Sequence, residues 1–237
     1  MKTCCEERVG EKFNEWSETY DDDLSGMAAY QETIARISDQ VVSHGASVVL
    51  DIGTGTGSLL LALSKRMKAK FFGIDISDQM LKKAGERFKE NGVDVELKKG
   101  SFLSIPLANH SVDTVISNMA LHHLPDSKKA QAAMEISRVL KNGGRAIIGD
   151  IIFFDPLDWS DATEENVLEK IKKAFGEDLK PEDVCCNMKR ILEMLREEYP
   201  TQAENLKEFF EESGFQVQID KVKYWFGILS AIQQHKI

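Results

Sequence analysis

Short apolar runs alternate with amphipathic stretches through the middle of the chain. An apolar run that ends at glycine or aspartate is typical of a buried strand, and apolar residues spaced three or four positions apart are typical of a helix. The predicted strands are Val48–Ile52, Phe71–Asp75, Val93–Lys98, Val112–Asn118 and Arg145–Ile152. The predicted helices are Leu59–Met67, Asp78–Asn91 and Ser127–Leu140. Strands that alternate with helices predict a parallel sheet with helices on both faces.

The two ends of the chain depart from this alternation. Helical spacing of Phe13, Trp16 and Tyr20 predicts one N-terminal helix, and a second is predicted from Met27 to about Ser43. Residues 156–212 have mostly helical patterns. The last two apolar runs, Phe215–Ile219 and Tyr224–Ile232, are too close for a crossover connection and predict an antiparallel hairpin at the sheet edge.

These patterns together predict one α/β domain with a Rossmann-like, seven-stranded, mostly parallel sheet. Within residues 1–237 we expect four parts. They are an N-terminal helical lid (1–45), a ligand-binding core (46–152), a helical insertion on the substrate side after the fifth strand (153–212) and the C-terminal strand hairpin (213–237).

Composition and charge narrow the class of protein. A formal net charge of −9 disfavours a nucleic-acid partner, and the basic stretch Lys65–Lys70 is expected to be solvated surface in a helix-to-strand connection. The chain has no apolar run of about 18 residues and no signal-peptide pattern, so we expect a cytoplasmic protein without membrane contact. The cysteines form two vicinal pairs, Cys4-Cys5 and Cys185-Cys186, which we expect to be reduced.

A glycine-rich turn follows the first predicted strand. Gly53, Gly55 and Gly57 allow a tight turn and close approach of a ligand, and the next helix offers its N-terminal amides to an anionic group. Asp75 ends the second strand 18 positions after Gly57, where a carboxylate can accept hydrogen bonds from ribose hydroxyls. A dinucleotide-binding turn has its third glycine one place later, at Ser58, so the spacing favours another adenosine-type cofactor.

This turn, preceded by Asp51, resembles motif I of the class I S-adenosylmethionine (SAM)-dependent methyltransferases. Four further segments resemble the later motifs of that family, in the expected order: Gly73–Leu81, Gly100–Leu107, Asp113–Leu124 and Arg138–Gly144. Phe13–Asp21 resembles the segment that folds over SAM in the small-molecule branch, which is similar to the ubiquinone/menaquinone-biosynthesis-type methyltransferases.

The resemblance implies a cofactor, SAM with S-adenosylhomocysteine (SAH) as product, and a set of residues that bind it. Asp51 is expected to contact the ammonium group, Asp75 the ribose hydroxyls, and Asn118 the cofactor at the end of the fourth strand. The implied cofactor-binding residues are Trp16, Tyr20, Asp51, Gly53, Gly55, Gly57, Asp75, Ile76, Met80, Ser101, Phe102 and Asn118.

One implied contact departs from the family pattern. The family often has aspartate where this chain has Ser101, and that aspartate accepts a hydrogen bond from the adenine amine. A serine hydroxyl accepts the same bond more weakly, and the backbone amide of Phe102 remains for adenine. We expect lower affinity for SAM from this change rather than its loss.

The catalytic residue and the methyl acceptor stay open at this stage. His122, His123 and Tyr20 are the candidates for catalysis or substrate contact, although each histidine is equally consistent with core packing. No set of His, Cys and Asp has the spacing of metal ligands, so no metal is expected. We expect a small-molecule acceptor in a pocket formed by the N-terminal helices, the loop after Asn118 and the insertion, with Phe153, Phe154, Trp159 and Tyr199 as candidate lining residues.

Three alternatives to this function remain. The first is a SAM-binding protein that does not transfer methyl groups. The second is an arsenite-type methyltransferase that uses its vicinal cysteines, and the third is a nicotinamide-dependent oxidoreductase. The sequence leaves the oligomeric state open.

Overall fold

A computed structural model describes residues 5–21, 27–154, 198–223 and 225–234. Its helices are α1 (Cys5–Trp16), α3 (Ala28–His44), α4 (Ser58–Ser64), α5 (Asp78–Glu90), the 3-10 helix η1 (Leu121–His123), α6 (Asp126–Val139) and α9 (Ala203–Glu212). Its strands are β1 (Val48–Ile52), β2 (Lys70–Asp75), β3 (Val95–Lys99), β4 (Val112–Asn118), β5 (Leu140–Phe153), β6 (Thr201–Gln202), β7 (Phe215–Lys223) and β8 (Phe226–Gln233).

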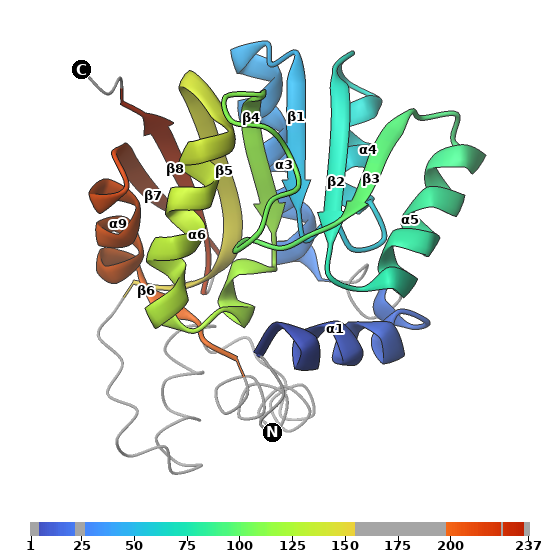
Figure 1. Cartoon of the computed structure of the whole chain (residues 1–237), viewed down its shortest axis with the longest axis horizontal. Helices are drawn as coiled ribbons and strands as arrows, with labels where there is room; N and C mark the ends of the chain where they lie inside the picture. Colours follow the sequence, from blue (N-terminus) through green and yellow to red (C-terminus); the bar gives the residue numbers. More distant parts are fainter. Residues whose placement is uncertain (1–4, 22–26, 155–197, 224, 235–237) are drawn as a thin grey trace.

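The strands form one sheet in the order β3-β2-β1-β4-β5-β8-β7, and the short β6 pairs with β5 beside that path (Figure 1). β1 to β5 pair in parallel, whereas β8 pairs antiparallel with both β5 and β7. The predicted Rossmann-like sheet of seven strands with an antiparallel C-terminal edge is therefore confirmed, and the two-residue β6 is an addition that no periodicity indicated.

Alternating side chains of the strands divide the core between the two faces of the sheet. Val49 and Phe71 join a cluster with residues of α3, α4 and α5, whereas Leu50 and Phe72 join a cluster with residues of α6 and α9. Both faces of the central strands are thus buried, which explains why β1 opens with three consecutive apolar residues, Val48 to Leu50, and does not alternate.

Helix α1 lies apart from these two layers. Figure 1 shows it across the edge of the sheet at which the parallel strands end. Because ligands of such sheets bind outside the carboxyl ends of the strands, α1 stands where a lid is expected.

Several predicted boundaries are wrong by a few residues. The first crossover helix ends at Ser64 instead of Met67, so the basic stretch does lie in a helix-to-strand connection. β5 begins at Leu140 instead of Arg145, because Leu140 already pairs with Val112 before the glycine turn at Gly143. Most of the helical insertion, including Trp159, lies outside the described residues.

In the part of the chain that the structure describes, no helix is both long and apolar enough to span a bilayer.

Candidate functional site

The glycine turn after β1 is held by the neighbouring strand. The backbone amides of Gly53 and Thr54 both donate to the carbonyl oxygen of Ile74, at 2.9 and 3.0 Å. Gly53 has φ +69°, and a Cβ atom there would lie 2.5 Å from the Cβ of Ala120. Only glycine combines this left-handed conformation with so close an approach of the loop after β4.

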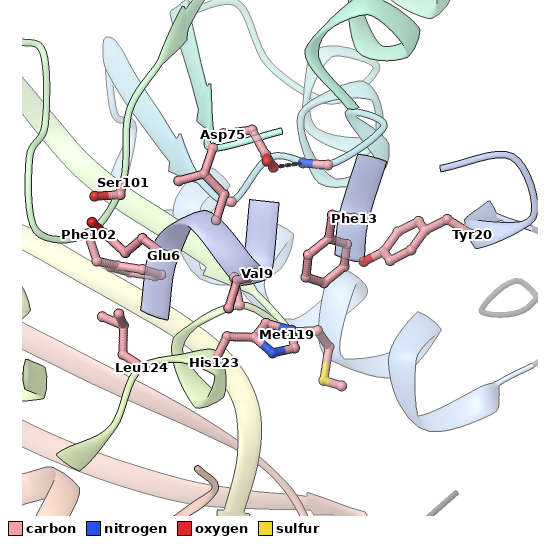
Figure 2. A pocket seen from close by; sticks show the side chains of 14 residues that line it. Glu6, Val9, Phe13, Tyr20, Asp75, Ser101, Phe102, Met119, His123 and Leu124 are labelled. Atoms are coloured by element: carbon pink, nitrogen blue, oxygen red, sulfur yellow. Dashed lines mark hydrogen bonds between the residues drawn. The ribbon is translucent and has the colours of Figure 1, made fainter. Parts of the chain in front are cut away.

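A pocket opens at this edge of the sheet, between the strand ends and α1. In the view of Figure 2, side chains of α1 lie between Asp75 and Ser101 on one side and Met119 and His123 on the other. The residues that line the pocket are Glu6, Val9, Phe13, Tyr20, Gly53, Gly55, Asp75, Ile76, Ser101, Phe102, Met119, Ala120, His123 and Leu124. Met119 has φ +59°, an uncommon conformation for a residue other than glycine, and such strain concentrates at ligand sites.

Asp75 is fixed at the end of β2 by two backbone amides. Its Oδ2 accepts a hydrogen bond from Gly55 at 2.9 Å, and its Oδ1 accepts one from Ser77 at 2.9 Å. Burial raises the pKa of Asp75, and these amide donors oppose that shift. A carboxylate oxygen can accept more than one hydrogen bond, so the side chain is oriented and still able to bind hydroxyl groups.

A second cavity adjoins the first through Tyr20 and Gly53 and is lined by Asp51 and Asn118. Thr54 Oγ1 donates to Asp51 Oδ2 at 2.8 Å, but Asp51 Oδ1 and both amide atoms of Asn118 are buried without a hydrogen-bond partner among the described residues. Burial raises the pKa of Asp51 to about 8. Unpaired buried polar atoms are costly, so this cavity suits a ligand with a cationic donor group.

The last turn of α1 and the segment that follows it are tied to the core by side-chain hydrogen bonds. Ser77 Oγ donates to Asn14 Oδ1 at 2.7 Å, and Thr56 Oγ1 donates to Asp21 Oδ1 at 2.6 Å. Tyr20 lies between these anchors with its ring edge-on to Trp16, at 5.0 Å between ring centroids. The Tyr20 ring therefore covers the pocket beside the glycine turn, where a Cβ atom at Gly55 would lie 3.8 Å from Tyr20 Cε1.

The two neighbouring histidines have different environments. His122 Nδ1 lies 2.5 Å from Asp150 Oδ1, and its Nε2 lies 3.4 Å from Glu198 Oε2. Burial alone lowers the pKa of His122, but Asp150 and Glu198 outweigh it and raise that pKa to about 9. His122 is thus a buried cation that does not line the pocket.

His123 lines the pocket as a neutral ring. Burial and the neighbouring cation of His122, 4.1 Å away between ring centroids, lower the pKa of His123 to about 3. Phe13 packs edge-on against it at 5.0 Å. Of the three candidate catalytic residues, His123 and Tyr20 reach the pocket, and burial raises the pKa of the Tyr20 hydroxyl well above 10, so this hydroxyl stays protonated.

Nitrogen atoms of both histidines and a carboxylate oxygen of Glu198 lie within 4.8 Å of one another. Residues of these types at this spacing can bind a metal ion. Sequence spacing gave no sign of it because Glu198 follows His123 by 75 positions. Lys12 Nζ contacts Glu198 Oε1 at 2.9 Å, and Asp150 already pairs with His122. The charges of this cluster are balanced by its own side chains, so we assign it as an ion network that joins α1 to η1.

The structure brings most of the expected cofactor-binding residues together, but not all. Tyr20, Gly53, Gly55, Asp75, Ile76, Ser101 and Phe102 line the first pocket, and Asp51 and Asn118 line the second with Tyr20 and Gly53. The exceptions are Gly57, Met80 and Trp16, which line neither cavity. Gly57 lies against the ring of Phe88, Met80 is fully buried in the core, and Trp16 packs edge-on against Tyr20.

Three of the four aromatic residues proposed for the acceptor pocket do not line the pocket described above, and the fourth, Trp159, lies outside the described residues. Phe153 is buried against Trp225, Phe154 borders a groove on the β7 side, and Tyr199 is exposed. Their side chains point elsewhere because β5 continues to Phe153 and its antiparallel partner β8 lies beside it. The vicinal pair Cys185-Cys186 and Cys4 lie outside the described residues.

Comparisons with known proteins agree with this geometry. Residues 49–144 match a family model described as a methyltransferase domain. An uncharacterized methyltransferase of Geobacillus sp. (strain WCH70) is 31% identical over 226 residues, which cover 94% of this chain and 96% of that protein.

Solved structures show the same fold at lower identity. The [4+2]-cyclase SpnF is 17% identical with a TM-score of 0.71, and the alignment covers 98% of this chain and 97% of SpnF. Magnesium protoporphyrin IX methyltransferase from Synechocystis PCC 6803 with bound SAH is 19% identical with a TM-score of 0.68, with coverage of 98% and 100%. None of these matches supports the arsenite alternative.

Proposed function

The chain belongs to the class I SAM-dependent methyltransferases, and on that premise we propose that it transfers a methyl group from SAM to a small-molecule acceptor in the pocket beneath α1. The observation that carries the proposal is the group of unpaired buried polar atoms at the end of β1 and β4. Asp51 Oδ1 and the amide of Asn118 lack partners in the described structure, and the amino-acid end of SAM has an ammonium group and a carboxylate that complement them.

The remaining residues of the two cavities fit the rest of the cofactor. Asp75 would hold the ribose hydroxyls, the turn at Gly53 and Gly55 would allow close contact, and Phe102 would pack against the adenine ring. Bound there, SAM supplies an activated methyl group that needs no further activation by the protein.

The protein's own part is to align the acceptor and to exclude water. The rings of Phe13 and Tyr20 cover the pocket, and His123 is a polar group of the lining that packs against Phe13. Since a pKa of about 3 makes His123 a weak proton acceptor, we assign to it orientation of the acceptor by hydrogen bonding rather than removal of a proton. Residues 1–45 and the insertion 153–212 would supply the acceptor side of the site.

The test is a screen for release of SAH from SAM with small metabolites as acceptors. We expect at least one acceptor to give turnover that Asp75→Ala abolishes. Glu32→Ala, which removes a half-exposed carboxylate of α3 paired with Arg36, should leave turnover unchanged. SAM binding that survives Asp75→Ala unchanged would contradict the assignment of the site.

A second candidate is a SAM-binding protein that does not transfer methyl groups. It is favoured by the similarity in fold to SpnF, a [4+2]-cyclase, because one fold supports different chemistries. Binding of SAM without release of SAH for any acceptor in the screen would favour this candidate.

A further inference from the structure

One carboxylate in the pocket comes from α1 instead of a strand end. Glu6 stands in the first turn of α1 and lines the pocket together with Ser101 and Phe102. Its Oε1 is shielded from solvent and has no hydrogen-bond partner among the described residues. In Figure 2, Glu6 lies at the Phe102 end of the pocket, opposite the end occupied by Tyr20. A buried carboxylate oxygen without a donor is costly, so this position is arranged for a ligand that donates a hydrogen bond.

The surroundings of Glu6 indicate which part of a ligand reaches it. A Cβ atom at Gly10 would lie 3.5 Å from the carbonyl oxygen of Ile76, so α1 crosses directly over the residue that follows Asp75. A nucleoside whose ribose is held by Asp75 therefore has its base at the Ile76, Ser101 and Phe102 end, below Glu6.

Ser101 supplies little acceptor capacity at that end of the pocket. Its Oγ accepts a hydrogen bond from the backbone amide of Leu103 at 3.1 Å, which directs the hydroxyl oxygen into its own turn. A neutral hydroxyl is also a weaker acceptor than a carboxylate. Glu6 thus presents the stronger acceptor to the base.

We propose that Glu6 Oε1 accepts a hydrogen bond from the exocyclic amine of the cofactor's adenine, an inference that rests on the proposed function. Helix α1 then contacts the adenine base directly, so binding of the cofactor stabilises α1 in the position that it has in this structure. Acidic residues in the first turn of a helix also stabilise its dipole. Glu7 meets that role from an exposed position on the same turn, whereas Glu6 is turned into the pocket.

The test compares two ligands by calorimetric titration of the full chain. The first is SAH, and the second is the SAH analogue in which hydrogen replaces the purine amine. We expect the wild-type protein to prefer SAH by about tenfold or more, since the lost bond has a charged acceptor. Glu6→Ala should reduce this preference to about threefold or less, and Glu6→Gln, which keeps a neutral acceptor oxygen, should be intermediate. Glu11→Gln, an exposed position on the same helix, should keep the wild-type preference.

The outcomes separate this inference from the proposed function. A wild-type preference that Glu6→Ala leaves unchanged overturns the role of Glu6 while SAH binding itself is retained. Loss of the preference in Glu11→Gln to the same extent would also overturn it, because the effect would then belong to the helix. A wild-type protein that binds neither ligand contradicts the proposed function instead.

Discussion

The substitution Asp150→Asn removes one charge from the ion network that joins α1 to η1. It nearly preserves the shape of the Asp150 side chain. In the folded protein, the pKa of His122 is about 9 instead of its ordinary 6.5, because Asp150 and Glu198 outweigh the effect of burial. That difference corresponds to about 3 kcal/mol of stabilisation. Both partners are almost fully buried, at 4% and 2% side-chain exposure, so solvent screening removes little of it.

The sign of the pH dependence follows from the raised pKa. A histidine with a higher pKa in the folded state stabilises the fold fully below pH 6.5, and this contribution is lost as the pH rises through about 9. The lowered pKa of Glu198 reflects the same ion pairs and is not counted again. Burial raises the pKa of Asp51 to about 8, so Asp51 also titrates in part of this range, and only the difference between wild type and variant isolates the network.

The assay is urea unfolding of wild type and Asp150→Asn at pH 6 and pH 9.5. We expect the variant to lose about 3 kcal/mol of unfolding free energy at pH 6 and about 1 kcal/mol at pH 9.5. The matched control is Asp113→Asn. Asp113 pairs with Lys141 at 2.7 Å, and that bond, with two backbone amide bonds, outweighs burial and lowers the pKa of Asp113, so its effect should be equal at both pH values. An Asp150→Asn effect of the same size at both pH values would refute a charged His122.

Two further predictions concern the glycine turn and Asp51. Gly57→Ala should destabilise the protein by about 2–3 kcal/mol in urea unfolding, because Gly57 has φ +84° and the new Cβ would lie 2.4 Å from Phe88 Cζ. Gly92→Ala, with φ +64° in open space, should cost only about 1 kcal/mol, and equal effects would contradict the steric argument. Since the pKa of Asp51 is about 8, SAH binding through its ammonium group at pH 7 should release about one proton. Calorimetry in buffers of different ionisation enthalpy measures this release, which Asp51→Asn should abolish; release that persists in the variant would exclude Asp51 as its source.

The fold was predictable from the sequence because its signals are local. The run Val48–Ile52 is buried on both faces and ends at a glycine that nothing else can replace, so its pattern and its boundaries agree with β1. The start of β5 was not predictable, because Leu140 extends the apolar pattern of α6 and becomes a strand residue only by pairing with Val112.

The position of a site residue was predictable from the sequence only where that residue lies at the end of a predicted strand. Asp75 is the last residue of β2 and Gly53 directly follows β1, and their positions in the pocket agree with that pattern. Glu198 approaches His122 through tertiary contact across the chain, and no spacing rule connects two residues so far apart. Glu6 was missed for a similar reason, since in the sequence it is one of two adjacent acidic residues in a charged helix.

The central claim is that the cavities at the carboxyl edge of the sheet bind SAM. Calorimetric titration of the wild-type chain with SAH, SAM and NAD tests it most directly. We predict that SAH and SAM bind to one site per chain, that Asp75→Ala weakens both, and that NAD does not bind. Binding of NAD without binding of SAM or SAH would contradict the account.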